Sequence, residues 1–463
     1  MKKKMAIISS YFKDESYGVL GPQMAATVIS EHTGYDCIVI AVTRIDDKSL
    51  IKKALKEYFK EQTPIIGFST LSGREDLFAF AGELKSEGAL IILAGPQSDV
   101  DYMGEIGWPD HPHRFRGVSE HFTFAIHGPA EQALPLLKGL DSGEWKEAPG
   151  LLYKKEDGEI IQNPKAPWNE AHLKRVKWNN IFTVVQGELI PLEISIAQVL
   201  QQVGCPYASE KRKMEIDYPA SLQGKERGTI EVSGKGCSFC DVAVDKGFCG
   251  ELTIETVMSQ ISCLPEDRDG RKIPFELINE NPLPGLPRLL KEAQKRDIML
   301  SQVHLILRSD WFLKGEDRLL EALHLADNMG IYVLVSSMGF EAFDDSLLRN
   351  FNKGVSVESN LRAIRLMRRL KKQFPEQWGY SKREGAIHGF IHPTPWDTTE
   401  TMACTQKNIA IYGLDRDILP PHSTPLIIHH ASTLADWIRE VEEREGVHFK
   451  REGSVIGWWD EEE

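Results

Sequence analysis

The sequence predicts an α/β protein with two parallel-sheet units in series and a small C-terminal extension. Short runs rich in Ile, Val and Phe alternate with amphipathic helical patterns over residues 1–145, and again over 201–415. A hairpin-and-linker segment, 146–200, separates the two series. A chain of 463 residues is long enough for two or three domains. We therefore predict a doubly wound, Rossmann-like sheet, then a partial (β/α)6 barrel, and an extension over 416–463.

Strands and helices alternate in the first unit. The strands are expected over residues 5–12, 35–42, 64–70, 89–95 and 123–127, and the helices over 22–31, 48–60, 74–86 and 130–140. Strands joined through helices form a parallel sheet with helices on both faces. Such a sheet binds ligands beyond the carboxyl ends of its strands, where the strand order reverses. We therefore expect a ligand site at that edge.

The segment between the two units is predicted to be a connector. Residues 149–163 indicate a β-hairpin with Asp157-Gly158 at its turn. Pro164, Pro167 and Trp168 then favour an extended linker.

The second unit repeats the alternation more regularly. Strands are expected over 229–233, 275–279, 303–309, 332–336, 386–391 and 417–419, and helices over 254–264, 286–296, 318–329, 358–373 and 399–411. Six strand–helix repeats predict a partial parallel barrel with its chemistry at the carboxyl ends of the strands. In the extension, 436–445 is expected to be an amphipathic helix.

The composition excludes several classes of protein. A net charge of −13 argues against a broad nucleic-acid footprint, which needs clustered Lys and Arg. No stretch is long and apolar enough to span a membrane, and the short apolar run after Lys4 meets charged residues too soon for a signal peptide. Seven cysteines are few and odd in number, which argues against a disulfide framework and favours a reducing cytoplasm.

Small residues gather where three strands of the first unit end, in 67–73, 93–96 and 127–131. Small side chains let a large, flat ligand approach the backbone. The same residues also form tight turns in sheets of this kind that bind no such ligand, so the pattern leaves both interpretations open.

A Cys-x-x-Cys pair, Cys237 and Cys240, follows the first strand predicted for the second unit. Two cysteines at this spacing can ligate one metal centre, and the motif alone fits zinc, redox and iron–sulfur roles.

Together these motifs resemble those of the cobalamin-binding radical S-adenosylmethionine enzymes over roughly residues 5–415. Phe239 fills the aromatic slot in the tail of that family's Cys-x-x-x-Cys-x-aromatic-Cys signature, but the first position is Ser233. Gly204-Cys205-Pro206-Tyr207 is similar to the front half of the same signature, so the polar stretch 209–228 looks like an insertion. The resemblance therefore implies a [4Fe-4S] cluster on Cys205, Cys237 and Cys240. Cys249 is the rival third ligand, and a degenerate barrel without a cluster is the alternative.

The resemblance also implies a cobalamin site. Ser69-Thr70-Leu71 resembles the family's Ser-x-Leu segment, and Gly95-Pro96 lies where the family has a Gly-Gly pair, with Ala94 at the first position. Gly128 and Glu131 match the turn that closes such domains. Gly18 lies in the loop 12–21, which matches the family's Asp-x-His-x-x-Gly segment but has no histidine, so no histidine of this loop is expected to ligate cobalt. The full set implied for cobalamin is Gly18, Ser69, Thr70, Leu71, Gly95, Pro96, Gly128 and Glu131.

The resemblance implies S-adenosylmethionine contacts at later strand ends. Beside Phe239, these are Asn279 and Glu280 after the second strand, Arg308 after the third and Glu341 after the fourth. Arg308 is expected to pair with the methionine carboxylate by a bidentate contact.

The implied activity is a radical reaction. S-adenosylmethionine is cleaved to a deoxyadenosyl radical, which takes hydrogen from an unreactive carbon, and methylcobalamin then methylates it. Some relatives instead catalyse rearrangement, ring contraction or cyclisation. A small-molecule substrate and an electron donor such as flavodoxin or ferredoxin are the expected partners, with neither nucleic acid nor membrane. The opposing hypothesis is a cobalamin carrier or sensor with an inactive barrel.

Overall fold

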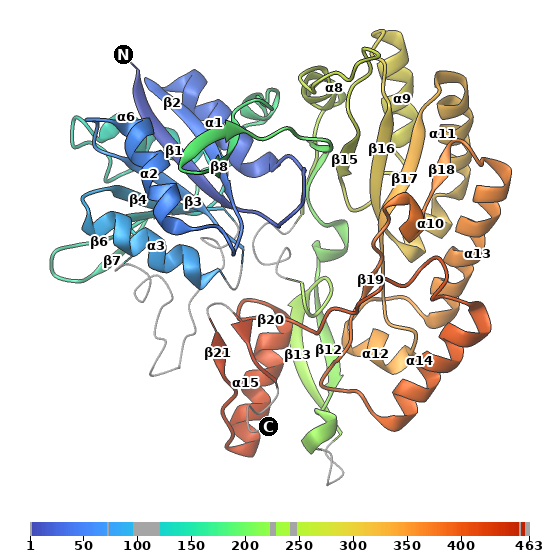
Figure 1. Ribbon diagram of the computed structural model, residues 1–463. Helices are drawn as coiled ribbons and strands as arrows, with labels where there is room; N and C mark the ends of the chain where they lie inside the picture. The colour runs from blue at the N-terminus through green and yellow to red at the C-terminus, as the bar shows by residue number, and fades with distance from the viewer. Residues whose placement is uncertain are drawn as a thin grey trace. The chain divides into compact units, whose positions relative to one another are not determined.

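The computed structural model describes residues 2–71, 74–95, 121–222, 228–240, 248–452 and 455–458. It divides into two compact units, Met1–Ala197 and Gln198–Glu463, each an α/β assembly around a mainly parallel sheet (Figure 1). The predicted fold class is therefore confirmed. No helix of the described residues is long and apolar enough to cross a membrane.

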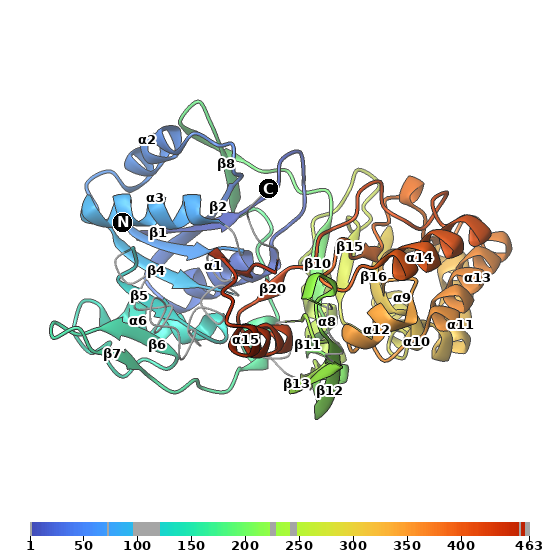
Figure 2. The ribbon, with the colours of Figure 1, turned by 90° about the horizontal axis from the view of Figure 1, so that it is seen from below.

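The first unit is built on a nine-stranded sheet in the order β7-β6-β5-β4-β3-β1-β2-β8-β9. Its parallel centre consists of β1 (Lys3–Ser10), β2 (Tyr35–Val42), β3 (Ile65–Ser69), β4 (Leu90–Ala94) and β5 (Phe124–Ile126). The helices are α1 (Leu20–His32), α2 (Lys48–Phe59), α3 (Glu75–Ser86), the 3-10 turn η1 (Ala130–Gln132) and α6 (Ala133–Gly139). Helices cover both faces of the sheet (Figure 2). All the strands and helices predicted here are present.

Strand order reverses between β1 and β3, because β1 pairs β2 on one side and β3 on the other. The carboxyl ends of these parallel strands meet at one edge, which the strand-order rule marks as a ligand site. The core beneath that edge is a continuous apolar cluster that includes Ile40, Phe68 and Phe80.

Antiparallel hairpins extend both edges of this sheet. The predicted hairpin is β6 (Leu151–Lys154) and β7 (Ile160–Gln162), and β6 pairs β5. On the other edge, β8 (Ile181–Val185) and β9 (Glu188–Pro191) form a hairpin within the segment predicted to be extended, and β8 pairs β2. Its turn residues Gln186 and Gly187 both have positive φ, as a type I′ hairpin turn requires. The short 3-10 turn η2 (Glu170–Leu173) precedes it.

The barrel sheet of the second unit has the order β10-β15-β16-β17-β18, with β19 paired to β17. The strands are β10 (Ala197–Leu200), β15 (Phe275–Ile278), β16 (Gln302–Arg308), β17 (Tyr332–Glu341), β18 (Trp378–Gly379) and β19 (Gly389–Phe390). Its helices are α8 (Ile254–Ser262), α9 (Leu286–Lys295), α10 (Ser309–Lys314), α11 (Glu316–Met329), α12 (Asp345–Asn350), α13 (Val357–Gln373) and α14 (Thr399–Tyr412), with the 3-10 turn η5 (Lys382–Glu384).

Two barrel strands were predicted wrongly. The predicted first strand, 229–233, is part of β13 (Thr229–Lys235), which pairs with β12 (Lys211–Asp217) in an antiparallel hairpin outside the barrel sheet. Alternate residues of β13 are exposed, as in a two-stranded ribbon, and the first barrel strand is β10. The predicted strand 417–419 is a turn. Two barrel strands, β10 and β18, were not predicted, and β18 has only two residues, so it shows no periodicity.

The C-terminal extension packs against the β12–β13 hairpin. It contains β20 (Ile428–His429), α15 (Thr433–Glu445), β21 (Arg451–Glu452) and β22 (Val455–Ile456). A side chain at Gly234 of β13 would overlap Thr433, so the start of α15 can approach only because this residue is glycine. The predicted inward side chains of α15, Trp437, Ile438 and Val441, are buried.

Candidate active site

The cysteine-bearing loops begin at the end of β10. The chain passes through β11 (Gln202–Gly204) to Cys205, and then through the 3-10 turn η3 (Pro206–Ala208) into the β12–β13 hairpin, whose outer loop begins with η4 (Ala220–Leu222). Because Lys211 pairs with Lys235, the chain leaves the hairpin beside the point at which it entered. Burial raises the pKa of the Cys205 thiol, and the nearby Glu280 carboxyl and Cys237 thiol raise it further. The insertion thus ends by bringing Cys237 within electrostatic reach of Cys205.

The Cys237–Cys240 turn is fixed by the carboxyl end of α12. Ser238 N donates to Phe351 O at 2.9 Å, and Ser238 Oγ donates to Asn350 O at 2.8 Å. Cys240 N donates to Cys237 O at 3.1 Å, which closes the turn. From the extension, Leu434 N donates to Ser238 O at 2.9 Å, so α15 supports the same turn.

Phe239 and Asn352 make further contacts that hold the Cys237–Cys240 turn in place. The Phe239 ring packs edge-on against Phe351, with ring centroids 5.5 Å apart. Asn352 Nδ2 donates to Gly236 O at 2.7 Å, and Tyr207 Oη donates to Asn352 O at 2.9 Å. Asn352 has φ of +46°, a left-handed conformation that asparagine adopts more readily than most residues. This one residue therefore links both cysteine-bearing segments.

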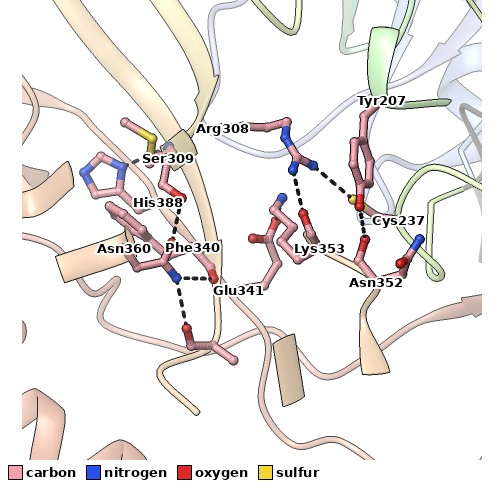
Figure 3. A network of polar contacts seen from close by, with 12 residues as sticks. Tyr207, Cys237, Arg308, Ser309, Phe340, Glu341, Asn352, Lys353, Asn360 and His388 are labelled. Atoms are coloured by element: carbon pink, nitrogen blue, oxygen red, sulfur yellow. Dashed lines mark hydrogen bonds and ion pairs between the residues drawn. The ribbon is translucent and has the colours of Figure 1, made fainter. Parts of the chain in front are cut away.

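Arg308, the last residue of β16, lies beside these loops (Figure 3). Its Nη1 donates to Cys237 Sγ at 3.6 Å, and its Nη2 donates to Lys353 O at 2.5 Å. Desolvation raises the pKa of the Cys237 thiol, while the Lys353 and Arg308 cations act in the opposite direction. The site is thus a partly buried thiol between two cations.

Glu341, the last residue of β17, forms a buried ion pair with Lys353, whose Nζ donates to Glu341 Oε1 at 2.8 Å. Glu341 Oε2 is buried and accepts no hydrogen bond within the part of the chain that the structure describes. Glu341 also has φ of +54°, which a non-glycine residue rarely adopts. Rare backbone conformations of this kind concentrate at functional sites. The free oxygen is an unused acceptor at the carboxyl edge of the barrel sheet.

Asn279 and Glu280 follow β15 at the same edge. Asn279 Nδ2 donates to Gln201 Oε1 at 2.9 Å, and Asn279 Oδ1 accepts from Asn281 N at 2.8 Å. Burial raises the pKa of Glu280, and the Lys353 and Arg308 cations oppose that shift. Both predicted residues therefore lie near the cysteine-bearing loops.

No group of three or more His, Cys, Asp or Glu side chains in the described residues could hold one metal ion. A cubane binds each cysteine to a different iron, so its thiolates need not converge on one point. Ser233, at the signature's first position, is exposed on the hairpin and donates to Arg212 O at 3.4 Å. The backbone of Cys249 lies in β14 (Phe248–Glu251), which pairs with β11 beside Cys205, and its side chain lies outside the described residues.

The strand ends of the first unit carry hydroxyl groups. Leu71 N donates to Ser10 Oγ at 3.1 Å, which ties the ends of β3 and β1 together at the switch in strand order. Thr70 Oγ1 is buried and has no hydrogen-bond partner in the described part of the chain. Gly95 has φ of +79°, and a Cβ there would lie 2.6 Å from Ser69 Oγ. The predicted residues Ser69, Thr70, Leu71 and Gly95 therefore lie together.

The other residues predicted to contact cobalamin are Gly18, Pro96, Gly128 and Glu131. Gly128 follows β5 with φ of +104°, and Glu131 Oε1 accepts from Asn169 N at 2.7 Å. A side chain at Gly18 would overlap the Trp178 ring, so close packing on Trp178 already requires this glycine. Pro96 lies outside the described residues.

Comparison with solved structures identifies the fold. OxsB, a cobalamin-dependent S-adenosylmethionine radical enzyme, aligns in its complex with aqua-cobalamin and S-adenosylmethionine with a TM-score of 0.62 and 13% identity. This chain has the fold of a cobalamin-dependent radical S-adenosylmethionine enzyme. The alignment covers 98% of this chain and 64% of that chain, so the chain spans a little under two thirds of the length of OxsB.

Two further OxsB structures agree. The complex with aqua-cobalamin alone gives a TM-score of 0.63 at 12% identity, and the apo, SeMet-labelled form gives 0.62 at 14%. No protein-family model and no curated protein matches the chain.

Tyr207 and Lys353 are the site residues that sequence reasoning missed. Neither was assigned a role, although Tyr207 lies in the segment 204–207 that resembles the signature. The Tyr207 ring lies under the Arg308 guanidinium, 4.0 Å from its central carbon, and Lys353 pairs with Glu341. A lysine directly before Gly354, which has φ of +69°, was the available signal.

Proposed function

We propose that this protein is a cobalamin-dependent radical S-adenosylmethionine enzyme that methylates an unactivated carbon of a small molecule. The observation that carries the proposal is the grouping of Cys205, Cys237 and the free Glu341 Oε2 at the carboxyl edge of a barrel with the OxsB fold. Carboxyl ends of barrel strands are where such folds do chemistry.

In this proposal, Cys205, Cys237 and Cys240 hold a [4Fe-4S] cluster. Such a cluster, held by three thiolates, would bind S-adenosylmethionine and would supply the electron for its cleavage. Glu341 Oε2 would accept a hydrogen bond from the bound cofactor, because this buried carboxylate oxygen has no partner among the described residues. Asn279 and Glu280 line the same edge, with Phe239 behind the cysteine turn.

Cobalamin is proposed to bind at the switch point of the first unit. The unpartnered Thr70 hydroxyl is suited to one of the amide groups around the corrin ring. Gly95 and Gly128, with positive φ at adjacent strand ends, keep the backbone open to a large ligand. The loop that contains Gly18 has no histidine to offer cobalt. Bound methylcobalamin would supply the methyl group.

Anaerobic reconstitution tests the proposal. The chain should bind one cobalamin and four irons and, with a low-potential donor such as reduced flavodoxin or ferredoxin and S-adenosylmethionine, should release 5′-deoxyadenosine. Glu341→Gln should weaken S-adenosylmethionine binding about tenfold, because it removes a charged partner from a buried site. Glu231→Gln is the control, because Glu231 is exposed on β13, where it accepts from Lys213 Nζ.

The products separate the remaining alternatives. S-adenosylhomocysteine formed alongside deoxyadenosine supports methylation, whereas deoxyadenosine alone, with a converted substrate, favours rearrangement, ring contraction or cyclisation. Bound cobalamin with no cluster and no deoxyadenosine would instead indicate a carrier or sensor.

A further inference from the structure

Each of the three guanidinium nitrogens of Arg308 donates to a protein group. Its Nε donates to Asp310 Oδ1 at 3.1 Å, its Nη2 to Lys353 O, and its Nη1 to Cys237 Sγ. A bidentate contact with a carboxylate needs two of these nitrogens on one side of the fork. The carboxylate contact expected from the sequence would therefore have to share these nitrogens with the partners that they already have.

Two aromatic rings also lie close to the guanidinium. Its central carbon lies 4.0 Å from the centre of the Tyr207 ring and 5.0 Å from that of Trp311. The side chain is only 5% exposed. A planar cation stacked on aromatic rings and bonded at its edges has little freedom to turn toward another ligand.

We propose that Arg308 is a positioning residue for the iron–sulfur cluster: it holds Cys237 through an N–H···S contact and stabilises the reduced cluster, instead of binding the carboxylate of S-adenosylmethionine. The inference rests on the proposed function, because it takes Cys237 to be a cluster ligand.

One short segment fixes both partners of this contact. Residues 350–353, at the end of α12, anchor Arg308 through Lys353 O and anchor the cysteine turn through Phe351 O and Asn352 Nδ2. Figure 3 shows the guanidinium between the Cys237 thiol and the Lys353 carbonyl. Different groups of the same segment thus hold Arg308 and the turn that contains Cys237.

The electrostatic consequence has a definite sign. One-electron reduction by the low-potential donor adds a negative charge to the cluster, and a nearby buried cation favours the more negative state. Hydrogen bonds to cluster sulfurs and local charge are established determinants of cluster potential. Loss of Arg308 should therefore make the cluster harder to reduce.

The test is an EPR-monitored redox titration of the reconstituted full chain. Arg308→Gln should retain iron and show a more negative midpoint potential than the wild type, with the affinity of the oxidised protein for S-adenosylmethionine changed less than twofold. Arg308→Lys, which keeps the charge but loses the planar fork, should fall between them. Arg318→Gln is the matched control, because Arg318 is an exposed arginine that bonds Glu321 on α11.

An unchanged midpoint potential in Arg308→Gln would overturn the inference. A loss of S-adenosylmethionine affinity of tenfold or more in Arg308→Lys, with the potential retained, would also overturn it and restore the carboxylate role. If Arg308→Gln fails to fold, the potential of Arg308→Lys decides by the same criterion. A wild-type chain that binds no iron would instead refute the proposed function, and the inference with it.

Discussion

The ammonium of Lys353 lies 2.8 Å from Glu341 Oε1, and both side chains are buried at the carboxyl end of β17. A pair of this kind is costly to break, because the remaining charge has no solvent around it. In the described residues no group donates to the other oxygen, Glu341 Oε2, and the proposed function uses this acceptor.

Lys353→Met should destabilise the protein by about 3–5 kcal/mol, because it leaves the Glu341 carboxylate buried without a countercharge. Urea denaturation of the cofactor-free chain measures this. In the double variant with Glu341→Gln, most of the loss should be recovered, since the stranded charge is gone. A double variant as unstable as the single one would show that Lys353 acts through packing and not through the pair.

The cysteine assignment predicts a specific pattern of iron loss. Cys205→Ala, Cys237→Ala and Cys240→Ala should each lose the cluster, because two thiolates hold it poorly, while Cys249→Ala should keep it. Iron and sulfide per chain after anaerobic reconstitution give the answer. Full iron in Cys205→Ala with loss in Cys249→Ala would transfer the role to Cys249, whose strand lies beside the same loop.

The parallel centre of the first unit could be predicted because its strands are buried on both faces. Runs such as that of β2 are almost continuously apolar and β-branched, and the helices between them are amphipathic. The β8–β9 hairpin was missed because proline and tryptophan upstream suggested an extended chain. The signal was Ile181–Val185 followed by Gln186-Gly187.

The error in the barrel had a different cause. β13 was taken for the first barrel strand because it directly precedes Cys237, and adjacency in sequence was treated as adjacency in the sheet. The insertion is itself the β12–β13 hairpin, so the first barrel strand is β10, which lies before Cys205 in the sequence. Pairing across 20 or more residues depends on tertiary packing, which local periodicity does not encode.

The residues of the candidate site were easier to predict than their partners. The positions of Arg308 and Glu341 at strand ends could be predicted, because topology fixes them. That Arg308 bonds Cys237 and the Lys353 backbone could not, because both contacts depend on how residues 350–353 fold.

Thr70→Val should have opposite effects on stability and on cobalamin binding. Without cobalamin, the variant should be as stable as the wild type or more stable by about 1 kcal/mol, because it removes a buried hydroxyl that has no partner in the described residues. Cobalamin affinity should fall about fivefold through the loss of one hydrogen bond of about 1 kcal/mol. Urea denaturation and cobalamin titration measure the two effects separately.

Thr27→Val is the matched control. Thr27 is equally buried, but its hydroxyl donates to Gln23 O at 2.7 Å and accepts from Lys177 N at 2.9 Å. That variant should lose about 1–3 kcal/mol of stability and keep its cobalamin affinity. If Thr70→Val binds cobalamin as tightly as the wild type, Thr70 is not a cobalamin contact.

His388 should make the second unit sensitive to acid. Its Nδ1 accepts from Met338 N at 3.0 Å, and its Nε2 lies 2.6 Å from Tyr380 O. Because the Met338 amide can only donate, Nδ1 must be unprotonated and Nε2 must carry the hydrogen. Burial lowers the pKa of His388 to about 4. A second proton would place two donors against each other.

The sign of the effect follows from linkage. The unfolded chain binds a proton at His388 near pH 6.5, and the folded chain does so only near pH 4, so stability is full above pH 6.5 and falls as the pH drops toward 4. Each such histidine contributes a slope of up to about 1.4 kcal/mol per pH unit in that window. Urea denaturation between pH 4 and 7.5 should show a shallower dependence of the unfolding free energy on pH in His388→Gln, whatever that variant's stability at pH 7.

His304 gives an independent comparison. Burial also lowers its pKa to about 4, and His304→Leu removes a buried Nε2 that has no partner in the described residues. Each variant should reduce the slope of unfolding free energy against pH by the contribution of one proton. An unchanged slope in both would show that the fold keeps neither imidazole neutral.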